Sequence, residues 1–192
     1  AFSAIDEIAT QSNLEANVKI TIAERIAPLL TSEKHSTREQ AFILIRRVAH
    51  SVATQSKDTN ISVLKLLVPL LSNEETDIVS KAIYTIEVIT SQSNLDDNTK
   101  ITILEYLVPL LSNEKTDIVR EAIYTIGKIA SQSNPDANTK TTMLEYLVPL
   151  LSNEETRIVC EAIQAIGKIA SQSNQDANTK TTMLEYLVPL LS

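Results

Sequence analysis

The chain has 192 residues, of which 43% are hydrophobic and 21% charged, and its formal net charge is −7. This apolar content is too high for a disordered tail, and two glycines with six prolines are too few for a collagen-like or low-complexity chain. The scarcity of glycine also disfavours all-β folds and phosphate-binding loops, because both need residues with positive φ. An intramolecular disulfide is excluded, since Cys160 is the only cysteine.

The same composition bears on location and on partners. The longest apolar runs, around LLVPLL, are far shorter than the roughly 20 residues that span a bilayer, so we expect no membrane segment. The excess of acidic residues disfavours nucleic acid as a partner, because neutralising phosphates needs a surplus of Lys and Arg. The unpaired cysteine and the absence of a signal peptide pattern predict an intracellular protein of the cytoplasm.

A period of 40 residues organises the chain. The string VPLL recurs at this spacing, with its proline at Pro69, Pro109, Pro149 and Pro189. Residues 109–148 and 149–188 are identical at 34 of 40 positions. We therefore predict a single array over 1–192. Its parts are a half repeat (1–13), a divergent repeat (14–54), three near-identical repeats (55–94, 95–134 and 135–174) and a half repeat (175–192).

In chain order, the pattern predicts a lone helix near 1–12, four pairs of helices, and a lone helix near 178–191, about ten helices in all. The first helix of a pair is typified by 138–152, where apolar residues recur at steps of three and four. Pro149 lies inside this pattern and cannot donate to the carbonyl of Glu145, so we expect a kink there. A polar turn leads to the second helix, whose predicted apolar stripe is Ile118, Val119, Ala122, Ile123, Ile126 and Ile129.

These pairs resemble the repeats of HEAT and armadillo proteins over the whole chain. LEYLVPLLSNEKTDIVREAIYTIGKIA is similar to the HEAT pattern, with a proline in the first helix, an amide at Asn113 in the turn, and V-R-x-A at Val119, Arg120 and Ala122. The glycine that separates the first two helices of an armadillo unit is missing, which favours two-helix, HEAT-like units. The resemblance implies an all-α fold: a right-handed α-α superhelix, or α-solenoid, of stacked HEAT/ARM-like pairs with a continuous core.

Positions that differ between the similar repeats gather on one face of the second helix, opposite the apolar stripe. The resemblance implies that this face lines the concave side and holds a protein or peptide partner. Harmless drift among recent duplicates is the competing interpretation, but drift would also have changed the exposed Glu105 and Tyr106 of the first helix, which recur as Glu145 and Tyr146 and as Glu185 and Tyr186. The predicted partner-binding residues are Arg46, Arg47, Tyr84, Arg120, Tyr124, Lys128, Gln164 and Lys168.

The charge of this face indicates the kind of partner. Armadillo importins hold an extended basic peptide with Trp and Asn at the positions that match Tyr124 and Lys128. In this chain the Asn position is occupied by Arg47, Val88, Lys128 and Lys168. A basic partner is therefore disfavoured, and we expect an acidic or mixed-charge peptide or protein.

No group of residues predicts catalysis, a cofactor or a metal. Cys160 lies about three repeats from His35 and His50, so no nucleophile can meet a base. No HExxH, CxxC or His-rich pattern offers zinc ligands, and two isolated glycines cannot build a phosphate loop. We expect a non-catalytic interaction scaffold, with no catalytic, cofactor-binding or metal-binding residues.

Two alternatives to such a scaffold stay open. The near-identical repeats also suit an engineered or recently amplified array without an evolved partner, and the resemblance allows an enzyme-associated, HEAT-like lyase subunit.

The two ends of the array have apolar residues without a covering helix. These residues are Phe2, Ile5 and Ile8 at one end and the apolar residues of 184–191 at the other. We expect end-to-end self-association through these uncapped termini.

Overall fold

Helical hairpins make up the described part of the chain. The computed structural model describes residues 2–9, 11, 14–53, 57–92, 97–133, 136–171, 181 and 185, and every regular element in them is an α-helix or a 3₁₀ helix. The chain divides after Asn94 into two units, residues 1–94 and 95–192, each with its own stack of helices.

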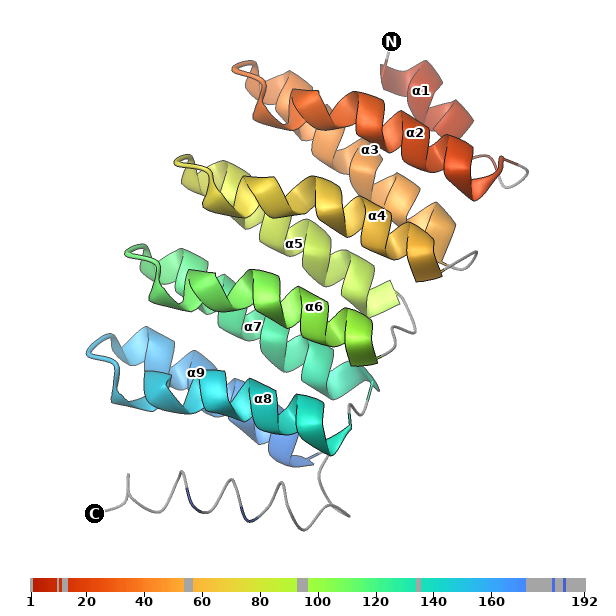
Figure 1. The fold of residues 1–192 in the computed structure, drawn as a ribbon. Helices are drawn as coiled ribbons and strands as arrows, with labels where there is room; N and C mark the ends of the chain where they lie inside the picture. The colour runs from red at the N-terminus through yellow and green to blue at the C-terminus, as the bar shows by residue number, and fades with distance from the viewer. Residues whose placement is uncertain are drawn as a thin grey trace. The chain divides into compact units, whose positions relative to one another are not determined.

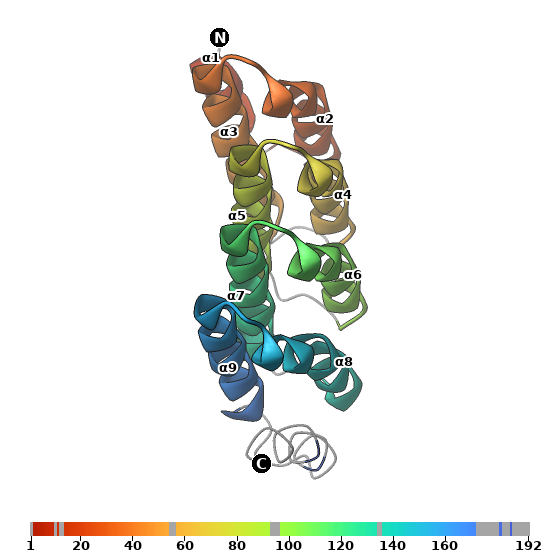
Figure 2. The same cartoon turned by 90° about the vertical axis from the view of Figure 1, so that its left-hand side faces the viewer.

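The first unit consists of a single helix and two hairpins (Figure 1). Its elements in chain order are α1 (Phe2–Ala9), α2 (Ala16–Ile26), the 3₁₀ helix η1 (Ala27–Thr31), α3 (His35–Ala53), α4 (Lys57–Leu67), η2 (Val68–Ser72) and α5 (Thr76–Gln92). Within this unit α2 packs against α3 and α4, and α3 packs against α1, α4 and α5. The first helices α2 and α4 form one layer, and α1, α3 and α5 form the other (Figure 2).

The second unit repeats this arrangement with two hairpins. Its elements are α6 (Asp97–Leu107), η3 (Val108–Ser112), α7 (Thr116–Ser133), α8 (Ala137–Leu147), η4 (Val148–Ser152) and α9 (Thr156–Ser171). The first helices α6 and α8 pack on each other, the second helices α7 and α9 do the same, and each hairpin is closed by contact of its second helix with the 3₁₀ turn. Each hairpin therefore buries its apolar faces against its own partner helix and against the neighbouring hairpin of its unit.

Each first helix changes from α to 3₁₀ geometry at its proline. α8 ends at Leu147, and η4 begins at Val148 with Pro149 in its first turn. Proline has no N–H for the carbonyl four residues earlier, whereas the first turn of a helix needs no such bond. The expected kink is thus an end of the α-helix followed by a 3₁₀ turn. The same change occurs in the three earlier hairpins of the described chain.

An asparagine shapes the turn between the two helices of a hairpin. The side-chain oxygen of Asn113 accepts a hydrogen bond from the main-chain N–H of Lys115 at 2.9 Å. The carbonyl of Lys115 in turn accepts hydrogen bonds from the N–H groups of Ile118 and Val119, in the first turn of α7. Asparagines at the same position of two other repeats, Asn73 and Asn153, make the same turn. This local bond fixes where the second helix begins.

The predicted apolar stripe of the second helix is confirmed as core. All six stripe residues of α7 are at most 2% exposed. In the first helix α8, Met143, Leu144 and Leu147 are buried as predicted. The apolar residues of η4 are only half-buried, although Leu110 and Leu111 at the same positions in η3 are buried.

The predicted lone helix at the start of the chain is confirmed as α1. The predicted helix near 178–191 and its apolar edge lie outside the described residues, apart from Thr181 and Glu185, and so does the side chain of Phe2. None of the described helices combines the length and the apolar run that crossing a bilayer requires.

Candidate partner-binding surface

Two exposed tyrosines occupy the same position of successive repeats. Tyr84 of α5 is 51% exposed and Tyr124 of α7 is 42% exposed, although large aromatic side chains are usually well covered. Both lie on the helix face opposite the buried isoleucines, so neither contributes to the core of its unit. Each unit therefore presents an exposed tyrosine ring on one of its second helices.

A cation lies over each of these rings. The guanidinium carbon of Arg46, on α3, is 5.1 Å from the centre of the Tyr84 ring. In the second unit, the Nζ of Lys168, on α9, is 4.9 Å from the centre of the Tyr124 ring, and the Nζ of Lys128 is 5.8 Å from it. Such contacts contribute about 0.5–1 kcal/mol at exposed sites. We call these two arrangements the tyrosine–cation pairs.

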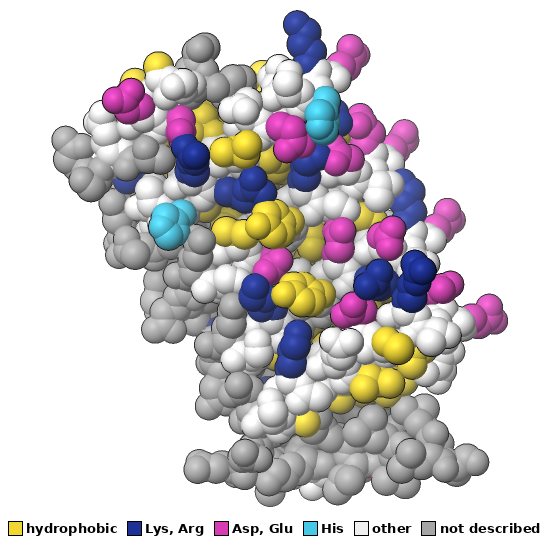
Figure 3. All heavy atoms as spheres, turned by 180° about the vertical axis from the view of Figure 1, so that it is seen from behind, with side chains coloured by type: hydrophobic (Ala, Val, Ile, Leu, Met, Phe, Trp, Pro, Cys, Tyr) yellow, Lys and Arg dark blue, Asp and Glu magenta, His cyan; other side chains and the backbone are white. Residues whose placement is uncertain are grey.

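Three of the predicted residues line one groove in the first unit, of about 550 Å³. The groove lies between α3 and α5 and is lined by Ile43, Arg46, Arg47, His50, Ser51, Tyr84 and Val88. In each unit, Lys and Arg side chains lie beside hydrophobic ones on the face of the second helices (Figure 3). His50 and Ser51 were not predicted, although His50 follows Arg46 by four residues and therefore lies on the same side of α3.

Arg47 has a further role, because its guanidinium forms an ion pair with Asp6 of α1. This pair joins α1 to α3 on the same face as the groove. A smaller hollow of about 290 Å³ lies beside it, with Ser3 and Asp6 on one side and Gln40 and Arg47 on the other. Arg47 is therefore held in place at the border between the two hollows.

The predicted residues of the second unit are arranged differently. Gln164 on α9 is exposed at the position that a tyrosine holds in α5 and α7. Arg120 of α7 donates to Glu161 of α9 at 3.1 Å and lies 3.7 Å from Asp117, so this arginine links two second helices. Tyr124, covered by its two lysines, remains the exposed aromatic group of this face.

A position that varies between repeats is a packing position in the second unit. A Cβ atom placed on Gly127 of α7 would lie 2.9 Å from the Cβ of Ala165 on α9 and 3.1 Å from its Cα. Variation between the repeats therefore does not mean that this position is free of packing constraints. The same position is Arg46 in α3 and Glu87 in α5, and the large Arg46 side chain lines the groove of the first unit.

A second cluster of charged residues joins α3 to α5. His35, Glu39 and Asp77 hold ligand atoms within 4.8 Å of one another, a spacing that would suit a metal ion. These carboxylates already form ion pairs with basic residues of the chain. Lys81 Nζ is 2.6 Å from Glu39 Oε1 and also pairs with Asp77, and Arg38 is 3.2 Å from Asp77. A metal ion would have to displace them, and we interpret the cluster as an ionic clamp between two second helices.

The electrostatics of this clamp favour its charged form. Hydrogen bonding from Lys81, with the positive charges of Lys81 and Arg38, lowers the pKa of Asp77 against the smaller opposing effect of burial. Partial burial by itself would lower the pKa of Lys81, but its hydrogen bonds to Asp77 and Glu39 together leave that pKa raised. Both shifts stabilise the paired state.

Comparisons with known proteins address the fold. A designed armadillo repeat protein matches with a TM-score of 0.59 and 19% identity, over 96% of this chain and 79% of that one. Another, in complex with the peptide (KR)4, matches with a TM-score of 0.55 and 18% identity, over 97% of this chain and 90% of that one. A crystal structure described as an engineered protein matches with a TM-score of 0.53 and 21% identity, over 98% and 80% of the two chains.

No protein-family model matches the sequence, and no curated protein matches it. At these levels of identity the structural likenesses show the fold alone. Together with the stacked hairpins of each unit, they confirm the predicted all-α solenoid of HEAT/armadillo-type repeats.

Proposed function

We propose that the chain is a non-catalytic scaffold that binds an acidic or mixed-charge peptide or protein segment on the face of its second helices. The observation that supports this most directly is the recurrence of the tyrosine–cation pair at Tyr84 and Tyr124. Tyrosine and arginine contribute heavily to protein interfaces, because they bury large areas at a modest cost in side-chain entropy. The proposed contact residues are Arg46, Tyr84, Tyr124, Lys128, Gln164 and Lys168.

Two predicted residues have a supporting part in this proposal. Arg47 is paired with Asp6, and Arg120 is paired with Glu161, so each already has a carboxylate partner within its unit. Breaking such a pair to bind a partner would forfeit its contribution. We therefore propose that Arg47 and Arg120 hold the second helices in register and add positive charge to the surface.

Charge complementarity favours an acidic partner. One structural neighbour was solved with the basic peptide (KR)4. In this chain, cations stand over both exposed tyrosine rings, and a basic peptide would have to approach them closely. Carboxylates, by contrast, would pair with these cations while apolar side chains pack on the rings, and like-charge contacts at interfaces cost affinity.

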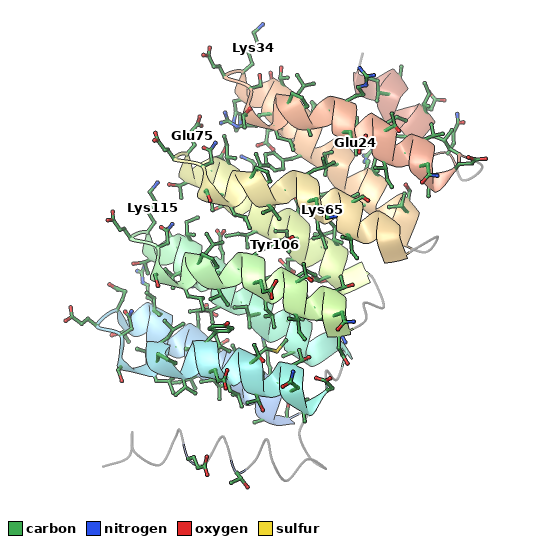
Figure 4. The ribbon with its side chains drawn as sticks, in the orientation of Figure 1. Glu24, Lys34, Lys65, Glu75, Tyr106 and Lys115 are labelled. Atoms are coloured by element: carbon green, nitrogen blue, oxygen red, sulfur yellow. The ribbon has the colours of Figure 1, made fainter. Side chains whose placement is uncertain are left out.

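The test is a binding titration by fluorescence anisotropy with two labelled probes, (DE)4 and (KR)4. We expect (DE)4 to bind and (KR)4 to bind at least tenfold more weakly. The double variant Tyr84→Ala/Tyr124→Ala should lose at least tenfold in affinity for (DE)4, as expected for two interface anchors. The matched control is Tyr106→Ala, on the first helix α6 (Figure 4), which should change the affinity less than twofold.

Two results would contradict the proposal. An equal loss of affinity in the Tyr106→Ala control would mean that the tyrosine substitutions weaken binding by destabilising the fold. If neither probe binds, the alternative of an engineered or recently amplified array without an evolved partner is favoured. The engineered protein among the structural neighbours is consistent with that alternative.

Self-association is a second proposal, supported by exposed isoleucines on α1 and α9. Ile163 of α9 is 56% exposed, whereas Ile83 and Ile123 at the same position are at most 1% exposed. Ile8 of α1 is also exposed. We propose that these exposed residues contribute to association between molecules. Sedimentation velocity should show a concentration-dependent oligomer that Ile163→Glu abolishes and that the neighbouring control Gln164→Glu leaves intact; a monomer at all concentrations would contradict it.

A further inference from the structure

The groove between α3 and α5 gathers hydrogen-bond donors on one helix. Arg46, Arg47 and His50, all on α3, line it beside Ser51, whose hydroxyl donates to the main-chain carbonyl of Val48 at 2.9 Å. Arg46 and His50 are four residues apart and so lie on the same side of α3. The residues of α5 that close the groove are Tyr84 and Val88. None of the described residues that line the groove is acidic.

The two arginines are held by different means. The guanidinium of Arg46 lies over the Tyr84 ring at 5.1 Å, and no carboxylate in the described part of the chain pairs with it. Stacking on a ring face leaves the N–H groups at the edge of a guanidinium available to an acceptor. Arg47 is held by Asp6 from outside the groove. One guanidinium is thus positioned without being neutralised, and the second, although paired with Asp6, adds positive charge beside it.

We propose that this groove binds a phosphorylated side chain, phosphoserine or phosphothreonine, of the peptide that the second-helix face takes up. This inference rests on the proposed function and specifies its ligand. A carboxylate has two oxygens and one charge, and a single arginine can satisfy it. A phosphoryl group offers three acceptor oxygens and a charge of about −1.5 to −2, which suits the guanidinium of Arg46 with the positively charged Arg47 and the imidazole of His50 beside it.

The walls of the groove suit the rest of such a side chain. Ile43 and Val88 offer apolar contacts, and the Tyr84 ring forms one side. The carbon atoms next to the phosphate would pack on these groups while the oxygens face α3. The volume of about 550 Å³ is ample for one phosphorylated side chain with its neighbouring main chain.

The other repeats lack this combination of donors. At the position of Arg46 they have Glu87, Gly127 and Gly167. At the position of His50 they have Ser91, Ser131 and Ser171. The divergence of the first full repeat therefore concentrates donors at one place on a face that otherwise repeats, and a single phosphate in this groove would fix the register of the bound peptide.

The experiment uses three labelled peptides, Asp-Leu-Asp-Xaa-Leu-Asp-Leu-Asp, in which Xaa is phosphoserine, serine or glutamate. Isothermal titration calorimetry of the full chain should give an affinity for the phosphoserine peptide at least tenfold higher than for the glutamate peptide, since one additional charge-assisted bidentate contact is worth about tenfold. Arg46→Gly, which introduces the residue of α7 and α9, should remove this preference. Arg46→Lys should keep part of it, because lysine retains the charge but not the planar fork.

Lys128→Ala in the second unit is the matched control. It should weaken all three peptides alike and leave the ratio of phosphoserine to glutamate affinity unchanged. Equal affinities of the phosphoserine and glutamate peptides, or a preference that survives Arg46→Gly in a chain with unchanged circular dichroism, would overturn the inference while leaving the proposed function in place. Failure of all three peptides to bind would overturn both.

Discussion

Gly127 of α7 and Ala165 of α9 approach so closely that a Cβ atom on the glycine would lie 2.9 Å from the alanine Cβ. The neighbouring atom at 3.1 Å is the Ala165 Cα, so the clash involves main chain and cannot be relieved by rotating a side chain. Small residues at both positions therefore let two second helices of the second unit pack against each other.

We expect Gly127→Ala to destabilise the protein. The added methyl group costs about 1–3 kcal/mol by overpacking, and the better helix propensity of alanine returns at most about 1 kcal/mol. Gly167→Ala is the matched control, because a Cβ there has no atom within 4 Å and should stabilise by about 0.5–1 kcal/mol. Urea unfolding measures both, and opposite signs are expected; stabilisation by both changes would mean that α9 shifts without cost.

The clamp between α3 and α5 should make stability depend on acidity. The pKa of Asp77 is lowered from its ordinary value of 3.8, so the pair contributes fully above that value and its contribution is lost as the pH falls through the lowered pKa. Because Asp77 is partly exposed, we expect Asp77→Asn to cost under about 1 kcal/mol at pH 7. Unfolding at pH 7 and at pH 2.5 should show this difference shrinking in acid; an equal difference at both values would argue against an ionic origin.

Asp136 should act as a helix cap. Its side-chain oxygen accepts a hydrogen bond from the main-chain N–H of Thr139 at 2.7 Å, at the start of α8. That bond is the main cause of its lowered pKa, with smaller effects of the Thr139 hydroxyl and of the positive charges of Lys100 and Lys140.

We expect Asp136→Ala to destabilise by about 1 kcal/mol, since the cap is lost, and Asp136→Asn to cost less, because asparagine also caps helices. The lowered pKa means that the ionic part of the effect is present above pH 3.8 and fades as the pH falls further. Chemical unfolding of the three proteins at pH 7 and pH 3 tests this order. Equal losses in both variants would show that the charge, rather than the cap, matters.

The thiol of Cys160 should be accessible and structurally neutral. It lies on α9 and is exposed, at a position that is serine in α5 and arginine in α7. We expect the folded protein to react with a thiol reagent about as fast as the unfolded chain, and Cys160→Ser to change the free energy of unfolding by no more than about 0.5 kcal/mol. Strong protection of the thiol in the folded protein would contradict this placement.

Much of the fold could be predicted from the sequence because it depends on local periodicity. The apolar stripe of α7, the turn at Asn113 and the presence of two helices per repeat all follow from residues a few positions apart. The end of α8 at Leu147, just before Pro149, was predicted less well, as a kink at the proline, because the choice between a kink and a 3₁₀ turn depends on how the following turn is bonded.

The candidate site, like the fold, could be predicted from the sequence only in part. The sequence by itself determined the 40-residue repeat, the pairing of helices and the face on which Tyr84 and Tyr124 lie, since each of these is a property of one repeat. Only the tertiary structure decided that Arg46 covers Tyr84 and that Lys168 covers Tyr124. Those contacts join side chains about 40 residues apart, and they depend on how adjacent helices are offset along their axes, which no single repeat encodes.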